Sequence, residues 1–371
     1  MTGRHPLNIG VEATSLLGTK TGIGAMTKAL LERFAAEPGL GVTALVISWR
    51  GRWQVGASLP PGIESQSLVF PARLAHQLWQ HLDWPSVNGF DVVHGPNFVV
   101  PPSAGGAEVI SVHDFGPWHF PELVTRHARA YPRLVKRALD RGAHVHVDSA
   151  FVEGEAEEIL GIESDRIHVV RLGFDPQEQG VGARGRERIG APYVLALGTI
   201  EPRKDLPTLV RAMAEVRGSL PDLKLVVAGP DGWGTEVFEG SVQHNRLGDR
   251  VIRLGYVSDV ERADLLAGAV CLAYPSIYEG FGLPPLEAMA ASTPVITTRA
   301  GSLPEVCGSA ALYVEPQDAS GLAAAIIEVV EDEVLAKALA VAGTAHIEGF
   351  SWDRAATEML DLYRQLAPPR S

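Results

Sequence analysis

Hydrophobic residues in the first half of the chain fall into short continuous runs that alternate with helical patterns. Apolar runs bounded by turn residues predict buried strands at Leu7–Ala13, Thr43–Ile47, Asp91–His94, Glu108–His113, Val145–Asp148 and Ile167–Leu172. Helical spacing of apolar residues predicts helices at Ala25–Ala36 and Tyr131–Ala138. Continuously apolar strands are typical of a parallel sheet that helices cover on both faces.

The second half repeats this alternation more regularly. Its predicted strands are Tyr193–Leu197, Lys224–Ala228, Val251–Gly255, Val270–Tyr274, Pro294–Thr297 and Leu312–Val314. Its predicted helices are Leu206–Val216, Arg262–Ala267, Leu286–Ala291 and Gly321–Val330. Strands that alternate with helices form βαβ units, so we expect an α/β protein with doubly wound sheets.

The two halves predict two Rossmann-like domains, over residues 1–178 and 190–350. The polar stretch Asp175–Pro192 lacks periodicity and is interpreted as the linker between them. After the Gly349–Ser351 break, an amphipathic helix is predicted at Trp352–Leu366. The segment assigned to this helix is residues 352–367. Because open α/β sheets bind ligands at the carboxyl ends of their strands, we expect the site in a cleft between the domains.

Composition and charge narrow the function classes. The 371-residue chain has 46% hydrophobic residues and a net charge of −12, which is typical of a globular protein and disfavours a nucleic-acid binder. A local basic patch could still attach it peripherally to a membrane. The two cysteines form no metal or disulfide pattern, and no signal peptide or transmembrane segment is recognised. We therefore expect a cytoplasmic protein, at most at the inner face of the plasma membrane, without a metal site.

The most informative motif runs from Glu279 to Glu287 and reads Glu-Gly-Phe-Gly-Leu-Pro-Pro-Leu-Glu. Two prolines suit the first turn of a helix, which predicts Glu287 near the third helical position, where a negative charge is favoured. Glycines after Glu279 let the backbone approach a ligand closely. The plain alternative is a helix-capping Glu287 and a solvated Glu279.

A second motif, Gly198–Asp205, follows the first strand of the second half. Arg203 and Lys204 stand at the start of the next helix, so they and the helix amides can receive a diphosphate. The alternative is a pair of solvated basic residues in a loop.

Two weaker candidates lie in the first half. Gly22 and Gly24 end the sequence Thr-Lys-Thr-Gly-Ile-Gly, which either bares amides to a phosphate or forms a structural turn. The motif lacks the third glycine of a dinucleotide fingerprint and the Lys-Ser/Thr of a Walker loop. His113 ends a predicted strand and either donates to a sugar hydroxyl or serves a structural role.

Together these motifs resemble those of the retaining glycosyltransferase family 4, which has the GT-B fold of two facing Rossmann-like domains. The likeness rests on Gly198–Asp205, Val226–Pro230, Gly255–Val257, Tyr274–Glu287 and Pro294–Pro304, and more loosely on Thr21–Gly24, Ser111–Asp114, Val147–Ala150 and Arg171–Asp175. It differs mildly at Tyr278, where Trp or Ser often precedes the first glutamate.

The resemblance implies roles for individual residues. Glu287 would hold the donor ribose, Glu279 the donor sugar, and Arg203 with Lys204 the diphosphate. Donor-binding residues would also include the glycine loop and the segment between the two glutamates, namely Gly22, Gly24, Gly280, Phe281, Gly282 and Leu283. His113 would stand beside the transferred sugar, and the final helix would return to the first domain.

The expected activity is the transfer of a hexose, with retention, from a nucleoside-diphosphate sugar to a hydroxyl. No metal or other cofactor is required, because Arg203 and Lys204 can stabilise the departing diphosphate. Resemblance around His113 and Phe120–Glu122 favours mannose from GDP-mannose, with UDP-sugars as an alternative donor. The acceptor is a glycan, a lipid-linked molecule or a small molecule. A glycoside hydrolase, a non-catalytic sugar-nucleotide binder and an NAD-dependent oxidoreductase are the rival functions.

Overall fold

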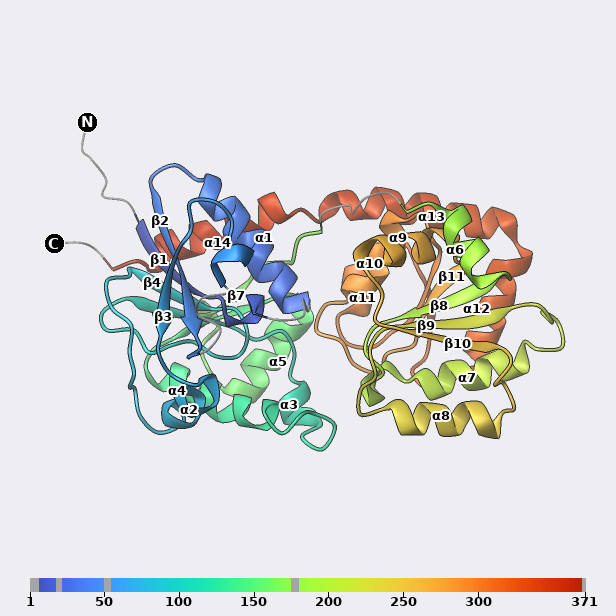
Figure 1. Cartoon of the computed structure of the whole chain (residues 1–371), viewed down its shortest axis with the longest axis horizontal. Helices are drawn as coiled ribbons and strands as arrows, with labels where there is room; N and C mark the ends of the chain where they lie inside the picture. The colour runs from blue at the N-terminus through green and yellow to red at the C-terminus, as the bar shows by residue number, and fades with distance from the viewer. Residues whose placement is uncertain (1–6, 18–21, 50–54, 175–179, 369–371) are drawn as a thin grey trace. The chain divides into compact units, whose positions relative to one another are not determined.

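The structure is a computed structural model, and it describes residues 7–17, 22–49, 55–174 and 180–368. The chain divides into two compact units (Figure 1). Unit 1 comprises Met1–Gly173 together with Phe350–Ser371, and unit 2 comprises Phe174–Gly349. Each unit contains one parallel β-sheet.

Unit 1 is built on a seven-stranded sheet in the order β3-β2-β1-β4-β5-β6-β7. Its strands are β1 (Leu7–Glu12), β2 (Leu40–Ile47), β3 (Glu64–Leu68), β4 (Val92–Gly95), β5 (Ala107–Ser111), β6 (His144–Val147) and β7 (Ile167–Val169). All neighbouring strands pair in parallel. The order reverses at β1, which lies between β2 and β4, and this reversal is the point where such sheets hold ligands.

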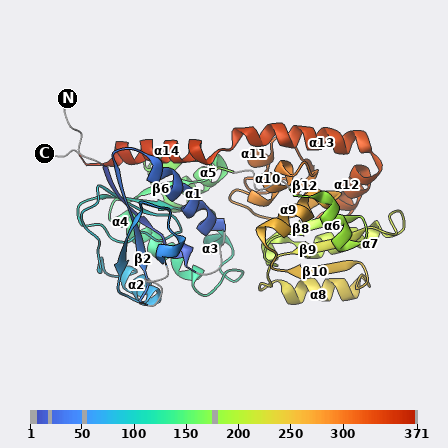
Figure 2. The same ribbon diagram turned by 45° about the horizontal axis from the view of Figure 1, so that its top comes forward.

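Helices cover both faces of this sheet (Figure 2). They are α1 (Gly22–Ala36), α2 (Ala72–Trp79), α3 (Gly116–His119), α4 (Tyr131–Asp140), α5 (Ala150–Leu160) and α14 (Trp352–Leu366), with the short 3-10 turns η1 (Thr14–Leu16), η3 (Val55–Ser58), η4 (Ala128–Ala130) and η5 (Ser164–Arg166). The last helix, α14, begins where the Ser351 hydroxyl accepts hydrogen bonds from two first-turn amides. It belongs to unit 1 and packs against α1, where Phe34 and Tyr363 meet edge to face.

A chain of buried polar side chains also anchors α14 to the sheet. The Tyr363 hydroxyl lies 2.6 Å from His94 Nδ1, His94 Nε2 lies 2.8 Å from Ser111 Oγ, Ser111 Oγ lies 2.8 Å from His146 Nδ1, and His146 Nε2 lies 2.9 Å from the Val170 carbonyl oxygen. Because that carbonyl can only accept, His146 Nε2 carries the hydrogen, and each earlier group then donates along the chain. Burial lowers the pKa of both histidines, which agrees with this neutral arrangement.

Unit 2 is built on a six-stranded parallel sheet in the order β10-β9-β8-β11-β12-β13. Its strands are β8 (Tyr193–Leu197), β9 (Lys224–Ala228), β10 (Val251–Gly255), β11 (Cys271–Tyr274), β12 (Val295–Thr298) and β13 (Leu312–Val314). Here the order reverses at β8, which lies between β9 and β11. The loops that follow β8 and β11 therefore start side by side at the carboxyl edge of this sheet.

Its helices are α6 (Gly182–Ile189), α7 (Leu206–Glu215), α8 (Thr235–His244), α9 (Asp259–Gly268), α10 (Leu283–Ala290), α11 (Leu303–Cys307), α12 (Ala319–Glu331) and α13 (Glu333–His346), with the 3-10 turns η6 (Pro202–Lys204) and η7 (Ile347–Gly349). The structure corrects the linker predicted at Asp175–Pro192. Residues 175–179 lie outside the described residues, but α6 is a helix that packs tightly against α9. At Gly185 a Cβ would lie 2.2 Å from the Asp264 carbonyl oxygen, so this glycine permits the close packing.

Candidate functional site

In unit 2, the strand order brings the two strongest sequence motifs together. η6 carries Arg203 and Lys204 after β8, and Glu279 follows β11. Asp205 ends η6 with a left-handed backbone, φ 46°, and redirects the chain into α7. The three charged side chains therefore converge at the carboxyl edge of the sheet, although they come from loops 75 residues apart.

Glu279 is the centre of this cluster. One carboxylate oxygen, Oε2, lies 2.7 Å from Arg203 Nη1, and the other, Oε1, lies 2.6 Å from Lys204 Nζ. Tyr274 donates its hydroxyl hydrogen to the same Oε1 at 3.0 Å, while that hydroxyl oxygen accepts from Lys204. Glu279 is only 5% exposed, so these contacts act away from most of the solvent.

The charges of the cluster set its protonation. Burial alone would raise the pKa of Glu279, but Arg203 and Lys204 lower it to about 2. Burial lowers the pKa of Lys204 against the opposing effect of Glu279. Arg203 also contacts Glu201, with 2.9 Å between Nε and Oε2. Two cations thus face two carboxylates, and a bound polyanion would have to compete with Glu279 for both basic side chains.

The backbone around Glu279 is held tightly by residues near α11. Ser302 Oγ lies 3.0 and 2.8 Å from the carbonyl oxygens of Glu279 and Phe281, which share its single hydroxyl hydrogen. Gly301 has φ 58°, and a Cβ there would lie 2.3 Å from the Glu279 carbonyl oxygen. The segment 280–283 therefore has a fixed course. Gly282, with φ 114°, precedes α10, which begins at Leu283 with the two prolines in its first turn as expected.

The position predicted for Glu287 was wrong by two residues. Because α10 begins at Leu283, Glu287 is the fifth helical residue, beyond the first turn, where the helix-terminal charge effect weakens. Its Oε1 lies 3.1 Å from Arg262 Nη1 on α9. Its Oε2 is buried with no hydrogen-bond partner among the described residues, and burial raises the pKa of this carboxyl. Such an oxygen is an unused acceptor.

In unit 1, His113 follows β5 and is fixed by two acceptors. Its Nδ1 lies 2.6 Å from Asp148 Oδ2, and its Nε2 lies 2.7 Å from the Pro96 carbonyl oxygen. Because both partners can only accept, both nitrogens carry hydrogen. Burial opposes this charge, but Asp148 raises the pKa of His113 to about 9. The imidazolium therefore has no ring N–H left over for the sugar hydroxyl that the sequence interpretation assigned to it.

The glycine motif differs from its predicted form. Residues Thr19–Thr21 lie outside the described residues, whereas Gly22 and Gly24 are part of α1. The predicted helix began only at Ala25, so the two glycines occupy the first turn rather than a preceding loop. A helix N-terminus still directs its first amides outward and favours an anion there.

Sequence reasoning missed several side chains that shape these sites. Tyr274 and Ser302 hold Glu279, and Asp148 holds His113. Glu12, the last residue of β1, is 6% exposed, and burial raises its pKa to about 7 despite hydrogen bonds from Thr14. A polar residue that ends or immediately follows an apolar strand was the available signal for Tyr274, Asp148 and Glu12.

Two further observations bear on the site. Among the described residues, no group of three or more His, Cys, Asp or Glu is arranged to hold a metal ion. In the same part of the chain, we find no helix with the length and apolar character that crossing a membrane requires.

Comparison with known proteins identifies the family. The family described as Glycosyltransferase Family 4 matches residues 21–178, and the family described as Glycosyl transferases group 1 matches residues 184–346. O-antigen chain mannosyltransferase B of Escherichia coli is 30% identical over 323 residues, which cover 82% of this chain and 80% of that protein. The glycogen synthase of Mycobacterium tuberculosis is 32% identical over 58% of this chain and 52% of its own.

Solved structures agree on the fold. Sucrose-phosphate synthase from Thermosynechococcus elongatus superposes with a TM-score of 0.77 at 23% identity, covering 98% of this chain and 99% of that one. Anabaena HepE, solved in complex with UDP and glucose, gives a TM-score of 0.74 at 17% identity over 98% of this chain and 100% of its own. The chain therefore belongs to glycosyltransferase family 4 and is a glycosyltransferase with the GT-B fold.

Proposed function

We propose that this glycosyltransferase moves mannose from GDP-mannose to an acceptor hydroxyl with retention of the anomeric configuration. The observation that carries the proposal is the contact of Arg203 and Lys204 with the buried Glu279 at the point where the strand order of unit 2 reverses. Two cations on adjacent residues match the two charged phosphates of a nucleoside diphosphate. The similarity to O-antigen mannosyltransferases favours mannose among the hexoses.

In this proposal Arg203 and Lys204 bind the diphosphate and stabilise the charge that develops as the sugar leaves. Because these side chains supply positive charge themselves, turnover should persist when a chelator removes divalent metal ions. Glu279 contacts the sugar, and Oε2 of Glu287, which has no partner among the residues that the structure describes, accepts hydrogen bonds from the ribose hydroxyls. The amides at the start of α1, with Gly22 and Gly24, contribute to the donor phosphates. His113 acts as a fixed cation on the acceptor side.

The donor is tested by thermal shift with GDP, UDP, ADP and dTDP, followed by turnover of GDP-mannose and UDP-glucose. At equal nucleotide concentrations, we expect GDP to stabilise the protein most. When the GDP concentration is 100 times its dissociation constant, the stabilisation should be about 2.7 kcal/mol. Selective stabilisation by UDP would assign a UDP-sugar donor instead, as bound by HepE. The anomeric signal of the product in an NMR spectrum tests retention, and an inverted product would refute it.

The roles of the two basic residues are tested by Arg203→Ala and Lys204→Ala. Each loses a charge-assisted contact to the leaving group, so kcat should fall by a factor of about 10² to 10³. Normal transfer by both variants would refute the assignment. Nucleotide binding without turnover on any glycan, lipid-linked or small-molecule acceptor would favour the rival function of a non-catalytic sugar-nucleotide binder.

We also propose that the enzyme acts in the cytoplasm, in peripheral association with the inner face of the plasma membrane. The net charge of −12 does not favour this association by itself, so it requires a local basic surface.

A further inference from the structure

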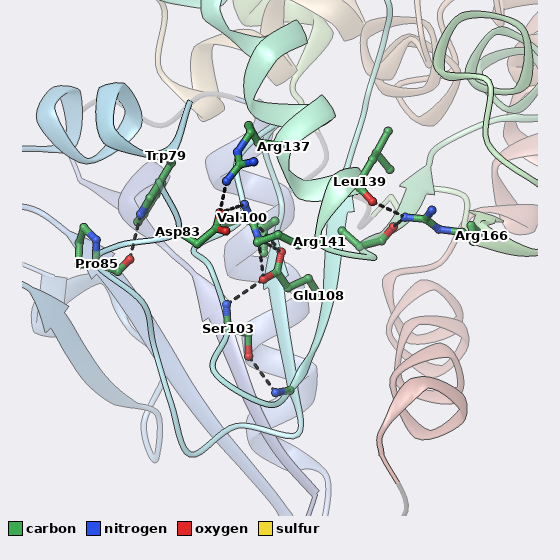
Figure 3. A network of polar contacts seen from close by, with 12 residues as sticks. Trp79, Asp83, Pro85, Val100, Ser103, Glu108, Arg137, Leu139, Arg141 and Arg166 are labelled. Carbon is green, nitrogen blue, oxygen red and sulfur yellow. Dashed lines mark hydrogen bonds and ion pairs between the residues drawn. The ribbon is translucent and has the colours of Figure 1, made fainter. Parts of the chain in front are cut away.

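Unit 1 carries a concentration of positive charge that the overall composition hides. Between Arg126 and Arg141 the chain has six basic residues and one acidic residue, although the whole protein carries a charge of −12. Half of these cations have acidic partners: Arg137 and Arg141 contact Asp83 or Glu108, as Figure 3 shows, and Lys136 contacts Asp140. The remaining three are exposed and form no ion pair with a described residue: Arg126, Arg129 and Arg133.

Exposed apolar side chains also occur on α2 and in the segment that follows it. Leu74 on α2 is 42% exposed, and Leu82 and Trp84 in the following segment are 53% and 58% exposed. The exposed side chain of Arg73 accompanies them on α2. We call this set the α2–α4 surface: Arg73, Leu74, Leu82, Trp84, Arg126, Arg129 and Arg133.

The elements that carry the α2–α4 surface pack against one another. The rings of His76 on α2 and His127 beside η4 stack at a centroid distance of 5.2 Å. Asp83, which lies between Leu82 and Trp84, contacts Arg137 of α4 at 2.8 Å. Figure 1 shows α2 and α4 side by side in unit 1. Exposed arginines and exposed apolar side chains therefore occur on elements that share one region of unit 1.

We propose that the α2–α4 surface docks the enzyme on a bilayer that contains anionic lipids. Arginines near such a bilayer are attracted by its negative surface potential, and their long apolar stems can lie along it. Tryptophan prefers the level of the lipid headgroups, where one part of its ring is wet and another is apolar. Exposed arginines and apolar side chains can bind a bilayer without the shape complementarity that a protein partner needs. The protein's overall negative charge disfavours a nucleic acid as the partner.

A row of packed rings connects this surface to His113 at the carboxyl edge of the sheet. Centroid distances are 5.9 Å from His113 to Phe98, 4.8 Å from Phe98 to Tyr131, and 5.6 Å from Tyr131 to His127. Phe98 adopts an unfavourable left-handed backbone, φ 56°, within this row. The proposed function places His113 on the acceptor side. On that basis, docking through the α2–α4 surface would bring hydroxyl groups of membrane-borne acceptors close to His113.

The test measures binding of the full chain to phosphatidylcholine vesicles with and without phosphatidylglycerol, over a range of salt concentrations. We expect binding only when phosphatidylglycerol is present, weakening as salt increases. The double variant Arg129→Glu/Arg133→Glu should bind at least about thirtyfold more weakly, because each basic residue near an anionic surface contributes roughly a fivefold gain. Arg217→Glu/Arg246→Glu, which changes two exposed arginines of unit 2 by the same charge, is the matched control.

A third variant separates the two contributions. Trp84→Ser removes apolar contact without changing charge, so it should weaken vesicle binding while leaving the slope of affinity against salt unchanged. The proposal is overturned if wild type fails to bind anionic vesicles, or if both arginine double variants bind equally well. Binding to polyglutamate but not to vesicles would also overturn it, in favour of an acidic macromolecule.

The outcome for the membrane is independent of the outcome for the reaction. Stabilisation by a nucleoside diphosphate and donor turnover do not require vesicles, and Arg129 and Arg133 are not donor-binding residues. Vesicle binding without turnover would count against the proposed function alone, whereas turnover without vesicle binding would count against the docking surface alone.

Discussion

The variant Glu279→Gln tests the electrostatics of the site most directly. Glutamine has nearly the shape of glutamate, so the substitution removes the negative charge between Arg203 and Lys204 while leaving the packing in place. Its amide nitrogen is a donor, however, and must face one of two other donors. Both the stability of unit 2 and its affinity for anions should therefore change.

The expected change in stability follows from the pKa of Glu279. A fall from the ordinary value of 4.5 to about 2 spans about 2.5 pKa units, which at 1.36 kcal/mol each gives about 3.4 kcal/mol. Because the folded-state pKa is the lower one, this contribution is present above pH 4.5 and disappears as the pH falls through 2. Burial of the Lys204 ammonium offsets part of it, so about 3 kcal/mol is an upper value at pH 7.

The expected change in binding has the opposite sign. In the wild type, a polyanion must share Arg203 and Lys204 with Glu279, whereas in the variant both cations are released. Inorganic pyrophosphate should therefore bind Glu279→Gln about tenfold more tightly, a gain of about 1.4 kcal/mol. Sugar transfer should nevertheless fall, because the proposed contact between Glu279 and the donor sugar is lost.

Urea unfolding of the wild type and the variant between pH 7 and pH 3 measures the first effect, and calorimetric titration with pyrophosphate measures the second. Glu239→Gln is the control, since Glu239 pairs with Arg253 at an exposed position of unit 2 and should contribute less than about 1 kcal/mol. The reasoning is refuted if pyrophosphate binds the variant no more tightly than the wild type. It is also refuted if the stability difference is as large at pH 3 as at pH 7.

Three further substitutions probe other charged and polar side chains. Glu287→Gln should leave the unliganded protein as stable as the wild type or more stable in urea at pH 7, because burial raises the pKa of Glu287 and its ionised form costs stability above pH 4.5. Nucleotide binding should weaken in the same variant. A large loss of stability would contradict the assigned cost of the buried charge. Tyr363→Phe should lower the free energy of unfolding by about 1–3 kcal/mol, since it leaves buried His94 Nδ1 without its donor, and an unchanged urea midpoint would show that the hydrogen bond contributes nothing. Asp148→Asn should lower the pKa of His113 from about 9 towards 6.5; an NMR titration that still places it near 9 would contradict the assigned cause.

Most strands could be predicted because they are buried on both faces. Tyr193–Leu197 and Lys224–Ala228 have the predicted bounds, as does the final helix Trp352–Leu366. The edge strand β3 was missed because its sequence, Glu-Ser-Gln-Ser-Leu, is polar and largely exposed. Helix α6 was missed because its arginines and glycines have no clear apolar period, and its packing on α9 depends on residues far along the chain.

At the site, the sequence could predict the edge of the sheet but not the partners. Residues that follow β8 and β11 were expected at one edge, and Arg203 and Glu279 do meet there. That Glu279 itself would engage both cations could not be predicted, because no periodicity relates residues 75 positions apart. The same holds for His113, whose ring nitrogens are both engaged by partners from other loops.

The pKa values of the two glutamates of one motif shift in opposite directions, downward for Glu279 and upward for Glu287. This contrast bears on how the site selects its ligand. Glu279 contacts two cations, Arg203 and Lys204, whereas one oxygen of Glu287 has no donor among the described residues. Pyrophosphate alone would compete with Glu279 and give nothing to Glu287. A nucleoside diphosphate can meet both demands, because its phosphates engage the cations while its ribose hydroxyls donate to Glu287. We therefore expect a nucleoside diphosphate to bind the wild type more tightly than pyrophosphate, and Glu287→Gln to remove much of that difference.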